Sequence, residues 1–240
     1  MSDAPKYKRI LLKISGESMS STGQSGIRSD AVELVVDELR PLIQMGVQVG
    51  LVVGGGNFVR GRDLAGVPAI HRVTADYMGM LATVINGIAL QDALESSGVP
   101  ARVLSAIPMP QVCEQFIRRV AVRHLEQGRV VILAGGTGSP FFTTDMCAAL
   151  RANEIAAEVL FKATKVDGVF DADPVKNPAA RKYDRLDYQK VLADRLGVMD
   201  LTAISMCMES RIPILVFQLD KPGNLLGAVT GQTVGTIITD

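Results

Sequence analysis

The sequence contains little cysteine and histidine, with three cysteines and two histidines in 240 residues. Cys113, Cys147 and Cys207 are far apart and outside any Cys-x-x-Cys spacing, so we expect free thiols in a reducing compartment, buried for packing. His71 and His124 are too few to complete a zinc site built from histidine and cysteine ligands. These scarcities argue against a disulfide scaffold and against a structural zinc site.

The sequence also lacks net charge, because its 25 basic residues balance its 25 acidic residues and its pI is about 6.7. A neutral balance argues against a broad electrostatic surface for nucleic acid or an anionic membrane. The N-terminus has no apolar signal core, and no apolar run approaches the ~20 residues that span a bilayer. We therefore expect a soluble, cytoplasmic protein without nucleic-acid or membrane partners.

Residues 129–145 are the most informative stretch of the chain. Residues 130–134 form a continuous apolar run, which is typical of a parallel strand covered on both faces. Three glycines follow directly and permit positive φ and a close approach of backbone to a ligand. Thr143 or Thr144 can then cap a helix whose N–H groups attract anions. The stretch predicts a phosphate-binding loop, and a tight turn that binds nothing is the alternative.

A lysine stands near the end of the first predicted strand. Residues 7–14 form that strand, Lys13 lies close to its carboxyl end, and Ser15 and Gly16 break it. Ligands of open α/β folds bind at this edge of the sheet, so Lys13 is a candidate for contact with an anionic ligand. A surface lysine on an edge strand is the other interpretation.

The second predicted strand, residues 47–53, ends in three consecutive glycines, and Arg60 lies just beyond them. The pattern lacks the third glycine of a dinucleotide fingerprint and the Gly-Lys-Ser/Thr of a Walker loop. No suitably spaced acidic residue follows the strand. An NAD-dependent dehydrogenase is therefore disfavoured.

A helix predicted over residues 74–94 is apolar nearly all round. Such a helix is buried, either in the core or against another subunit. Asp76 stands near its start, where the helix dipole favours a carboxylate. Asp76 therefore either caps this helix or binds the hydroxyl groups of a ligand.

Three further expectations concern two helices and a loop elsewhere in the chain. Ser29 is the expected cap of a helix over residues 30–45. Apolar residues from 113 to 124 predict one face of another helix, which makes His124 a core or boundary side chain and not a ligand. The charged segment 171–186 is predicted to be a long loop with a function or mobility of its own.

Strands that alternate with helices predict an α/β fold: a doubly wound, mainly parallel sheet with helices on both faces, in three α/β/α layers. We expect one domain over residues 1–240. Its binding crevice lies along the carboxyl ends of the strands, where Lys13, Lys162 and the glycines at 54–56 and 135–138 all fall. These signals agree with one another and predict a phosphate-containing ligand.

Five blocks of sequence also carry a family resemblance: residues 7–17, 54–57 with 60–61, 76–83, 138–145 and 162–169. They resemble the bacterial uridylate kinases, which have the amino-acid-kinase fold. The resemblance runs over nearly the whole chain. It implies a homohexamer that makes UDP from UMP with ATP, with magnesium carried by the nucleotide and GTP and UTP as effectors.

The resemblance implies roles for individual residues. The roughly 1–150 half is expected to hold the acceptor and the 151–240 half to hold ATP. The implied ATP contacts are Lys13, Ile14, Ser15, Gly16, Gly56, Arg60, Thr164, Phe170 and Asp173. The implied UMP contacts are Gly55, Asp76, Thr137, Gly138, Ser139, Pro140, Phe141, Phe142, Thr143 and Thr144. The implied catalytic residues are Lys13, Arg60 and Asp145.

This chemistry has repulsion between two polyanions as its main obstacle, which cations and backbone N–H groups offset. The acceptor phosphate has a second pKa near ~6 and is already ionised at neutral pH, so no general base is expected. Asp145 then suits the orientation of Lys13 or of the metal's waters. Which of Asp145, Lys162 and Asp200 contributes most to catalysis stays open.

Two rival functions stay open as well. The first is a kinase of the same fold that phosphorylates a carboxylate or carbamate, against which Asp76 and residues 138–145 speak. The second is a nucleotide-binding sensor or storage protein without turnover, which the presence of Lys13, Arg60 and Asp145 disfavours.

Overall fold

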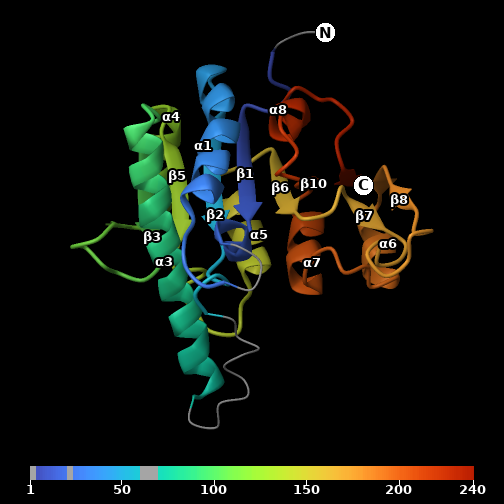
Figure 1. Ribbon diagram of the computed structural model, residues 1–240, viewed down its shortest axis with the longest axis horizontal. Coiled ribbons are helices and arrows are strands. Elements are labelled where there is room, and N and C mark those ends of the chain that lie inside the picture. The colour runs from blue at the N-terminus through green and yellow to red at the C-terminus, as the bar shows by residue number, and fades with distance from the viewer. Residues whose placement is uncertain (1–3, 21–23, 60–69) are drawn as a thin grey trace.

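The computed structural model describes residues 4–20, 24–59 and 70–240, and a nine-stranded sheet runs through them (Figure 1). Its strands are β1 (Arg9–Ile14), β2 (Gln48–Val53), β3 (Ala101–Ser105), β4 (Glu114–Gln115), β5 (Val130–Ala134), β6 (Val159–Thr164), β9 (Arg185–Leu186), β10 (Ile214–Gln218) and β11 (Thr236–Ile238). Their order is β4-β3-β5-β2-β1-β6-β10-β11-β9. All neighbours are parallel except β10 and β11. The predicted mainly parallel sheet is confirmed.

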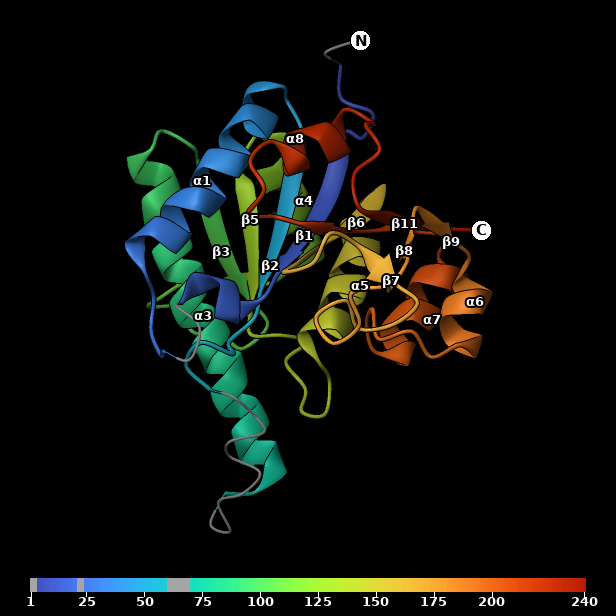
Figure 2. The ribbon, with the colours of Figure 1, turned by 45° about the vertical axis from the view of Figure 1, so that its right-hand side comes forward.

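Helices cover both faces of the sheet (Figure 2). They are α1 (Ser29–Gln44), α3 (Arg72–Ser96), α4 (Arg118–Glu126), α5 (Thr144–Glu154), α6 (Tyr188–Ala193), α7 (Leu201–Glu209) and α8 (Asn224–Val229), with a short 3-10 helix η1 (Gly16–Met19). One buried cluster joins α1, α3 and α8 to the sheet, and a second joins α4, α5, α6 and α7 to its other face. The three-layer prediction is confirmed.

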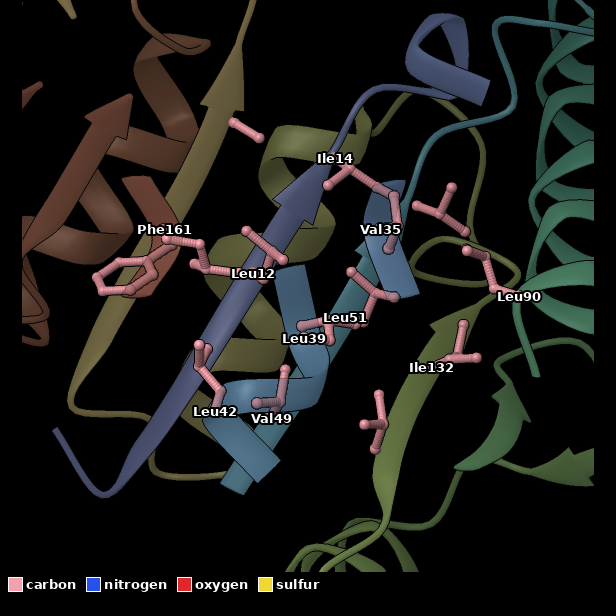
Figure 3. Close-up of a cluster of buried hydrophobic side chains, with 14 of the residues drawn as sticks. Leu12, Ile14, Val35, Leu39, Leu42, Val49, Leu51, Leu90, Ile132 and Phe161 are labelled. Carbon is pink, nitrogen blue, oxygen red and sulfur yellow. The ribbon is translucent and has the colours of Figure 1, made fainter. Parts of the chain in front are cut away.

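The apolar composition of the central strands explains this arrangement. In β1, Leu12 and Ile14 belong to the cluster on the α1 side and Leu11 to the cluster on the α5 side. Figure 3 shows Leu12 and Ile14 among Val35 and Leu39 of α1. Because alternate residues of a strand point to opposite faces, a strand with apolar residues on both faces is stable only with a helix on each side.

The expected helix cap at Ser29 is wrong. Ser29 is the first residue of α1, and Arg28 holds the capping position, where its side chain pairs with Asp30 and makes no capping bond to the helix backbone. The Ser29 hydroxyl instead donates to Glu33 Oε1 one turn later, at 2.6 Å. A serine next to a helix start can serve either the backbone or a neighbouring carboxylate, and here the carboxylate is within reach.

The expected helix over residues 113–124 begins only at Arg118. The residues before it form β4, which pairs with the end of β3, and the Phe116 N–H donates to the Ser105 carbonyl at 2.8 Å. An open sheet edge offers backbone hydrogen bonds that override the local periodicity. His124 is buried as predicted, with Nε2 3.1 Å from Glu114 Oε2 and Nδ1 2.8 Å from Arg129 Nη1.

The segment 171–186 is not one continuous loop. It contains β8 (Lys182–Tyr183), which pairs with β7 (Val169–Phe170), and it ends in β9 at the edge of the large sheet. The Thr236 hydroxyl of β11 joins the β7–β8 pair to the large sheet. It accepts from the Val169 N–H at 2.8 Å and donates to the Tyr183 carbonyl. Short strands of two residues give no periodic signal, so pairing alone decides them.

Helix α3 carries apolar side chains both toward the sheet and toward solvent, and only those toward the sheet are covered by the rest of the protein. Its N-terminal part projects beyond the sheet in Figures 1 and 2. A row of large apolar side chains remains 40–48% exposed, and we call it the α3 stripe: Val73, Tyr77, Leu81, Ile85 and Ile88. The spacing of four, four, four and three residues places the stripe along one side of the helix.

By length and composition alone, α3 is the one helix among the described residues that could cross a membrane, and 44% of its most apolar window is buried inside the molecule. The expectation that no segment reaches spanning length therefore does not hold for α3. The buried side chains of α3 pack against the sheet as those of a core helix do, and a core helix can have the length and composition of a membrane-spanning one.

Candidate functional site

A cavity of about 690 Å³ opens at the carboxyl ends of β2 and β5, beside α3 and the start of α5. We call it the first cavity. Five of the predicted acceptor contacts line it: Gly55, Asp76, Phe142, Thr143 and Thr144. Residues from five separate parts of the chain meet here because the carboxyl ends of parallel strands share one edge of the sheet.

The loops after β1 and β2 touch through their backbones. A Cβ atom on Gly16 would lie 2.5 Å from the nitrogen of Gly56 and 2.6 Å from the oxygen of Gly54. No side chain fits at such a distance, so glycine is required at position 16. The close approach fixes the position of the glycine loop that borders the first cavity.

The predicted cap at the start of α5 is confirmed and is Thr143. Its hydroxyl accepts from the Met146 N–H at 3.1 Å and donates to the carboxylate of Asp200. Asp200 in turn caps α7 by accepting from the Ala203 N–H at 2.9 Å. The N-terminus of α5 therefore borders the first cavity at Thr144, where the positive end of the helix dipole attracts negative charge.

Three charged side chains lie together beside these loops. The carboxylate of Asp145 contacts Lys13 Nζ at 2.9 Å and Lys162 Nζ at 2.7 Å. Lys13 and Lys162 are direct neighbours on the parallel strands β1 and β6. Their side chains are only 12% and 11% exposed, and that of Asp145 is 17% exposed. Lys162 also donates to the carbonyl of Val198.

The protonation of this cluster follows from burial and charge. Burial raises the pKa of Asp145, but the charges of Lys13 and Lys162 outweigh it, and the pKa is lowered overall. Burial lowers the pKa of Lys162, the Asp145 carboxylate opposes this and the charge of Lys13 adds to it, so that pKa is lowered as well. Within these three side chains one carboxylate thus faces two ammonium groups, which leaves the cluster itself with an excess of positive charge, and the carboxylate of Asp200 acts on Lys162 more weakly than Asp145 does.

A second cavity of about 490 Å³ begins at the end of β6. Three predicted ATP contacts line it: Thr164, Phe170 and Asp173. The strand order β5-β2-β1-β6-β10 places β1 between the strands that carry the two cavities. Lys13, at the end of β1, therefore stands between them.

Gly56, a predicted ATP contact, lines the first cavity and not the second, and the remaining predicted contacts have other surroundings. Ile14 is fully buried in the core, so only its backbone could reach a ligand. Ser15 caps η1 by accepting from the Glu17 N–H at 3.2 Å. Thr137 to Pro140 belong to the loop that leads to α5, and Phe141 beside them is 64% exposed with φ of 71°. Arg60 lies outside the described residues.

Asp76 is not in the first turn of its helix, because α3 begins at Arg72. Of the two interpretations of Asp76, capping of the helix is therefore wrong. Its carboxylate instead pairs with Arg72 at 2.9 Å and accepts from the backbone N–H of Phe141 at 2.8 Å. The second contact ties α3 to the loop at the mouth of the first cavity and leaves Asp76 lining that cavity.

The sequence placed Lys162 at the binding edge of the sheet and left its contribution to catalysis open, without giving it a partner. The signal was present, since Lys162 is the one charged residue of a strand that is otherwise apolar apart from its last residue. A charge in such a strand is buried, and it persists only with a partner. Asp145 as that partner was not visible from the sequence, because the two residues belong to different elements.

Comparison with known proteins agrees with this geometry. A family model described as the amino acid kinase family matches residues 8–218. The chain belongs to the amino acid kinase family. It is 53% identical over 234 residues to a uridylate kinase of Methylococcus capsulatus, covering 98% of each chain, and 52% identical to one of Dichelobacter nodosus, covering 98% and 97%.

Solved structures of two UMP kinases have the same fold. The UMP kinase of Bacillus anthracis matches with a TM-score of 0.95 and 37% identity, over 98% of this chain and 96% of that one. The UMP kinase of Ureaplasma parvum matches with a TM-score of 0.92 and 35% identity, over 98% and 100%. The similarity to the uridylate kinases that the sequence suggested is confirmed.

The charged cluster predicts how stability depends on pH. Replacing Asp145 with asparagine leaves Lys13 and Lys162 without their counter-charge, which costs about 3 kcal/mol for a broken buried pair. Because the folded pKa of Asp145 is lowered, its stabilisation is present above the unfolded value of about 3.9 and is lost as pH falls through the folded pKa. Denaturant unfolding should show the difference between the wild type and Asp145→Asn narrowing below about pH 4.

The exposed Asp37 on α1 provides the control. It pairs with Arg40 at 3.4 Å in solvent, so Asp37→Asn should change stability by less than about 0.5 kcal/mol. A difference between wild type and Asp145→Asn that stays constant from pH 7 to pH 3 would show that the carboxylate charge is not what holds the cluster.

Proposed function

We propose that this protein transfers the γ-phosphoryl group of Mg-ATP to UMP and so produces UDP in pyrimidine nucleotide synthesis. One observation carries the proposal: a buried cluster with excess positive charge stands between two cavities at one edge of the sheet. The identity of more than half to curated uridylate kinases supports UMP as the acceptor. The role of each residue below is part of the proposal.

The arrangement addresses the repulsion between two nucleotides. A phosphoryl group in transfer carries dispersed negative charge, and fixed cations and dipoles stabilise it without reorganisation. Lys13 is carried by β1, which lies between the strands that carry the two cavities, and the N-terminus of α5 borders the first cavity. Asp145 holds both lysines in place through its two oxygens. On family grounds Arg60 adds a further cation.

The reaction needs no general base. UMP arrives with its phosphate largely ionised at neutral pH, because its second pKa is about 6. Asp145 is poorly suited to accept a proton, since its pKa is lowered by two ammonium groups. Its proposed role is orientation of Lys13 and Lys162.

The two cavities divide the substrates between the halves of the chain. We assign the first cavity, whose lining comes from residues 17–147, to UMP, and the second, whose lining comes from residues 164–216, to ATP. This agrees with an acceptor half over residues 1–150 and a donor half over residues 151–240. In the first cavity Asp76 offers carboxylate oxygens to the ribose hydroxyl groups.

Magnesium fits this site as part of the nucleotide. Among the described residues no group of three or more His, Cys, Asp or Glu side chains comes together, and Asp145 is the carboxylate of the cluster. Mg²⁺ is usually held by substrate phosphates, waters and one or two carboxylates, so Asp145 would orient its waters. When bound, the ion neutralises phosphate charge.

The proposed function is tested by mixing the protein with Mg-ATP and each of UMP, CMP, AMP, GMP and N-acetylglutamate, and following ADP release. We expect turnover with UMP, and GTP should raise it and UTP lower it. Lys13→Ala should lower kcat by about 10²-fold or more, as for other losses of a transition-state cation or donor. Lys8→Ala, at an exposed lysine just before the amino end of β1 and so at the opposite edge of the sheet, should leave kcat unchanged.

The rivals give different results in this assay. Turnover with N-acetylglutamate alone would indicate a carboxylate kinase, and nucleotide binding without ADP release would indicate a sensor. A Lys13→Ala variant that retains most of its kcat would exclude the catalytic role of Lys13.

The assignment of Asp76 has its own test. Asp76→Asn removes the charge that accepts from ribose hydroxyls and weakens the bond to the Phe141 N–H. The KM for UMP should rise about tenfold while kcat at saturating UMP changes little, because ground-state and transition-state contacts are lost equally. Steady-state kinetics with varied UMP measure this, and an unchanged KM would contradict the ribose assignment.

We further propose that the protein is a cytoplasmic homohexamer and that the α3 stripe forms one of its subunit contacts. The stripe is a continuous apolar surface, of the kind that marks an interface. Light scattering on the purified protein should give six times the 25.6 kDa chain mass.

Ile85→Lys, in the middle of the stripe, should reduce the oligomeric mass. Val175→Lys, at a valine that is 82% exposed outside the stripe, should leave the mass unchanged. If the wild-type protein is a monomer at micromolar concentration, the proposal that the α3 stripe is a subunit contact is refuted.

A further inference from the structure

One turn of α3 carries two buried polar side chains in the middle of an apolar helix. Thr83 is 5% exposed and Asn86 is fully buried. Buried polar groups in an apolar helix are costly unless each of them is hydrogen-bonded. Both side chains face the loops that follow strands β2 and β5, and neither was singled out by the sequence.

Thr83 holds the loop that follows β5. Its hydroxyl donates to the carbonyl of Met80 at 2.7 Å and accepts from the backbone N–H of Gly135 at 2.8 Å. The bond to Met80 uses the hydroxyl proton, so a lone pair is left pointing at Gly135. Gly135 is the first residue after β5 and has φ of 73°, which starts the glycine turn.

Asn86 holds the loop that follows β2. Asn86 and Asn57 exchange two amide hydrogen bonds, at 2.8 and 2.7 Å. The remaining N–H of Asn86 donates to the Gly54 carbonyl at 2.7 Å, and that of Asn57 donates to the Gly26 carbonyl at 2.8 Å. All four amide N–H groups are thus used in a closed network.

The same loop also contacts the helix backbone directly. A Cβ atom on Gly55 would lie 2.5 Å from the Gly79 carbonyl oxygen and 2.8 Å from Ala82 Cβ. The loop therefore has no room to move toward α3, and the Asn86 network prevents it from moving away. Gly55 lines the first cavity, as does Gly136, the neighbour of Gly135.

We propose that Thr83 and Asn86 are positioning residues that set the separation of the two glycine loops across the first cavity. The two residues are three positions apart on one turn of α3, so both loops are bonded to the same rigid turn of helix. This proposal rests on the proposed function only in taking UMP as the ligand of the first cavity. A loop released from its anchor populates the binding-competent position for a smaller fraction of the time, which weakens apparent affinity by that fraction.

Thr83→Val tests the anchor with little change of shape, because valine lacks only the hydroxyl. The KM for UMP should rise about tenfold, while the KM for ATP stays within about twofold, since the second cavity is on other strands. Thr83→Ser retains the hydroxyl and should restore the KM for UMP. Thr74→Val makes the same change at an exposed position of α3 and is the matched control.

Amide hydrogen exchange gives a readout that does not depend on turnover. The Gly135 N–H should exchange about tenfold faster or more in Thr83→Val, and near the wild-type rate in Thr83→Ser and Thr74→Val. Asn86→Leu should raise exchange in the loop after β2. If Asn86→Leu does not fold, the Thr83 variants decide the proposal by themselves.

The outcomes separate the two proposals. A wild-type protein without UMP turnover would refute the proposed function, and hydrogen exchange would still decide the anchoring. Unchanged Gly135 exchange and an unchanged KM for UMP in Thr83→Val would overturn the positioning role, as would a serine variant that behaves like the valine variant. A purely structural role would lower the folded fraction of Thr83→Val without changing the KM for UMP.

Discussion

The structure depends on the ion pairs that Asp145 makes with two lysines. Parallel pairing brings Lys13 of β1 and Lys162 of β6 side by side, largely out of solvent, where two ammonium groups repel each other. The carboxylate of Asp145, delivered by the first turn of α5, makes this arrangement stable. Because one negative charge does not balance two positive ones, the cluster remains attractive to phosphate. The same geometry that stabilises the fold therefore prepares the site.

Helix α3 links this site to the outer surface. Its inner face holds both glycine loops through Thr83 and Asn86, and its outer face presents the α3 stripe. The N-terminal part also carries Asp76, which binds the loop at the mouth of the first cavity. A single helix thus contacts the glycine loops, the cavity and the surface where we place a neighbouring subunit.

The fold was predictable because its signals are local and repeated. The apolar run of β5 is fully buried as expected, and Thr143 caps the following helix as one of two predicted candidates. The predictions that failed concern residues for which several hydrogen-bond partners compete. The segment before α4 pairs with a sheet edge, and Ser29 bonds to Glu33 and not to the backbone. Residues next to a strand edge or a helix start have more than one possible partner, and sequence periodicity does not choose between them.

The sequence by itself determined the parallel three-layer fold, the edge of the sheet at which Lys13, Lys162 and the glycine loops gather, and the similarity to the uridylate kinases. These follow from composition along the chain and from short motifs. Only the tertiary structure decided that Asp145 lies between two lysines, that Asp76 contacts Phe141, and that Asn57 pairs with Asn86. Each of these contacts joins residues that are distant in the chain, and their distance depends on how strands and helices pack, which no local pattern encodes.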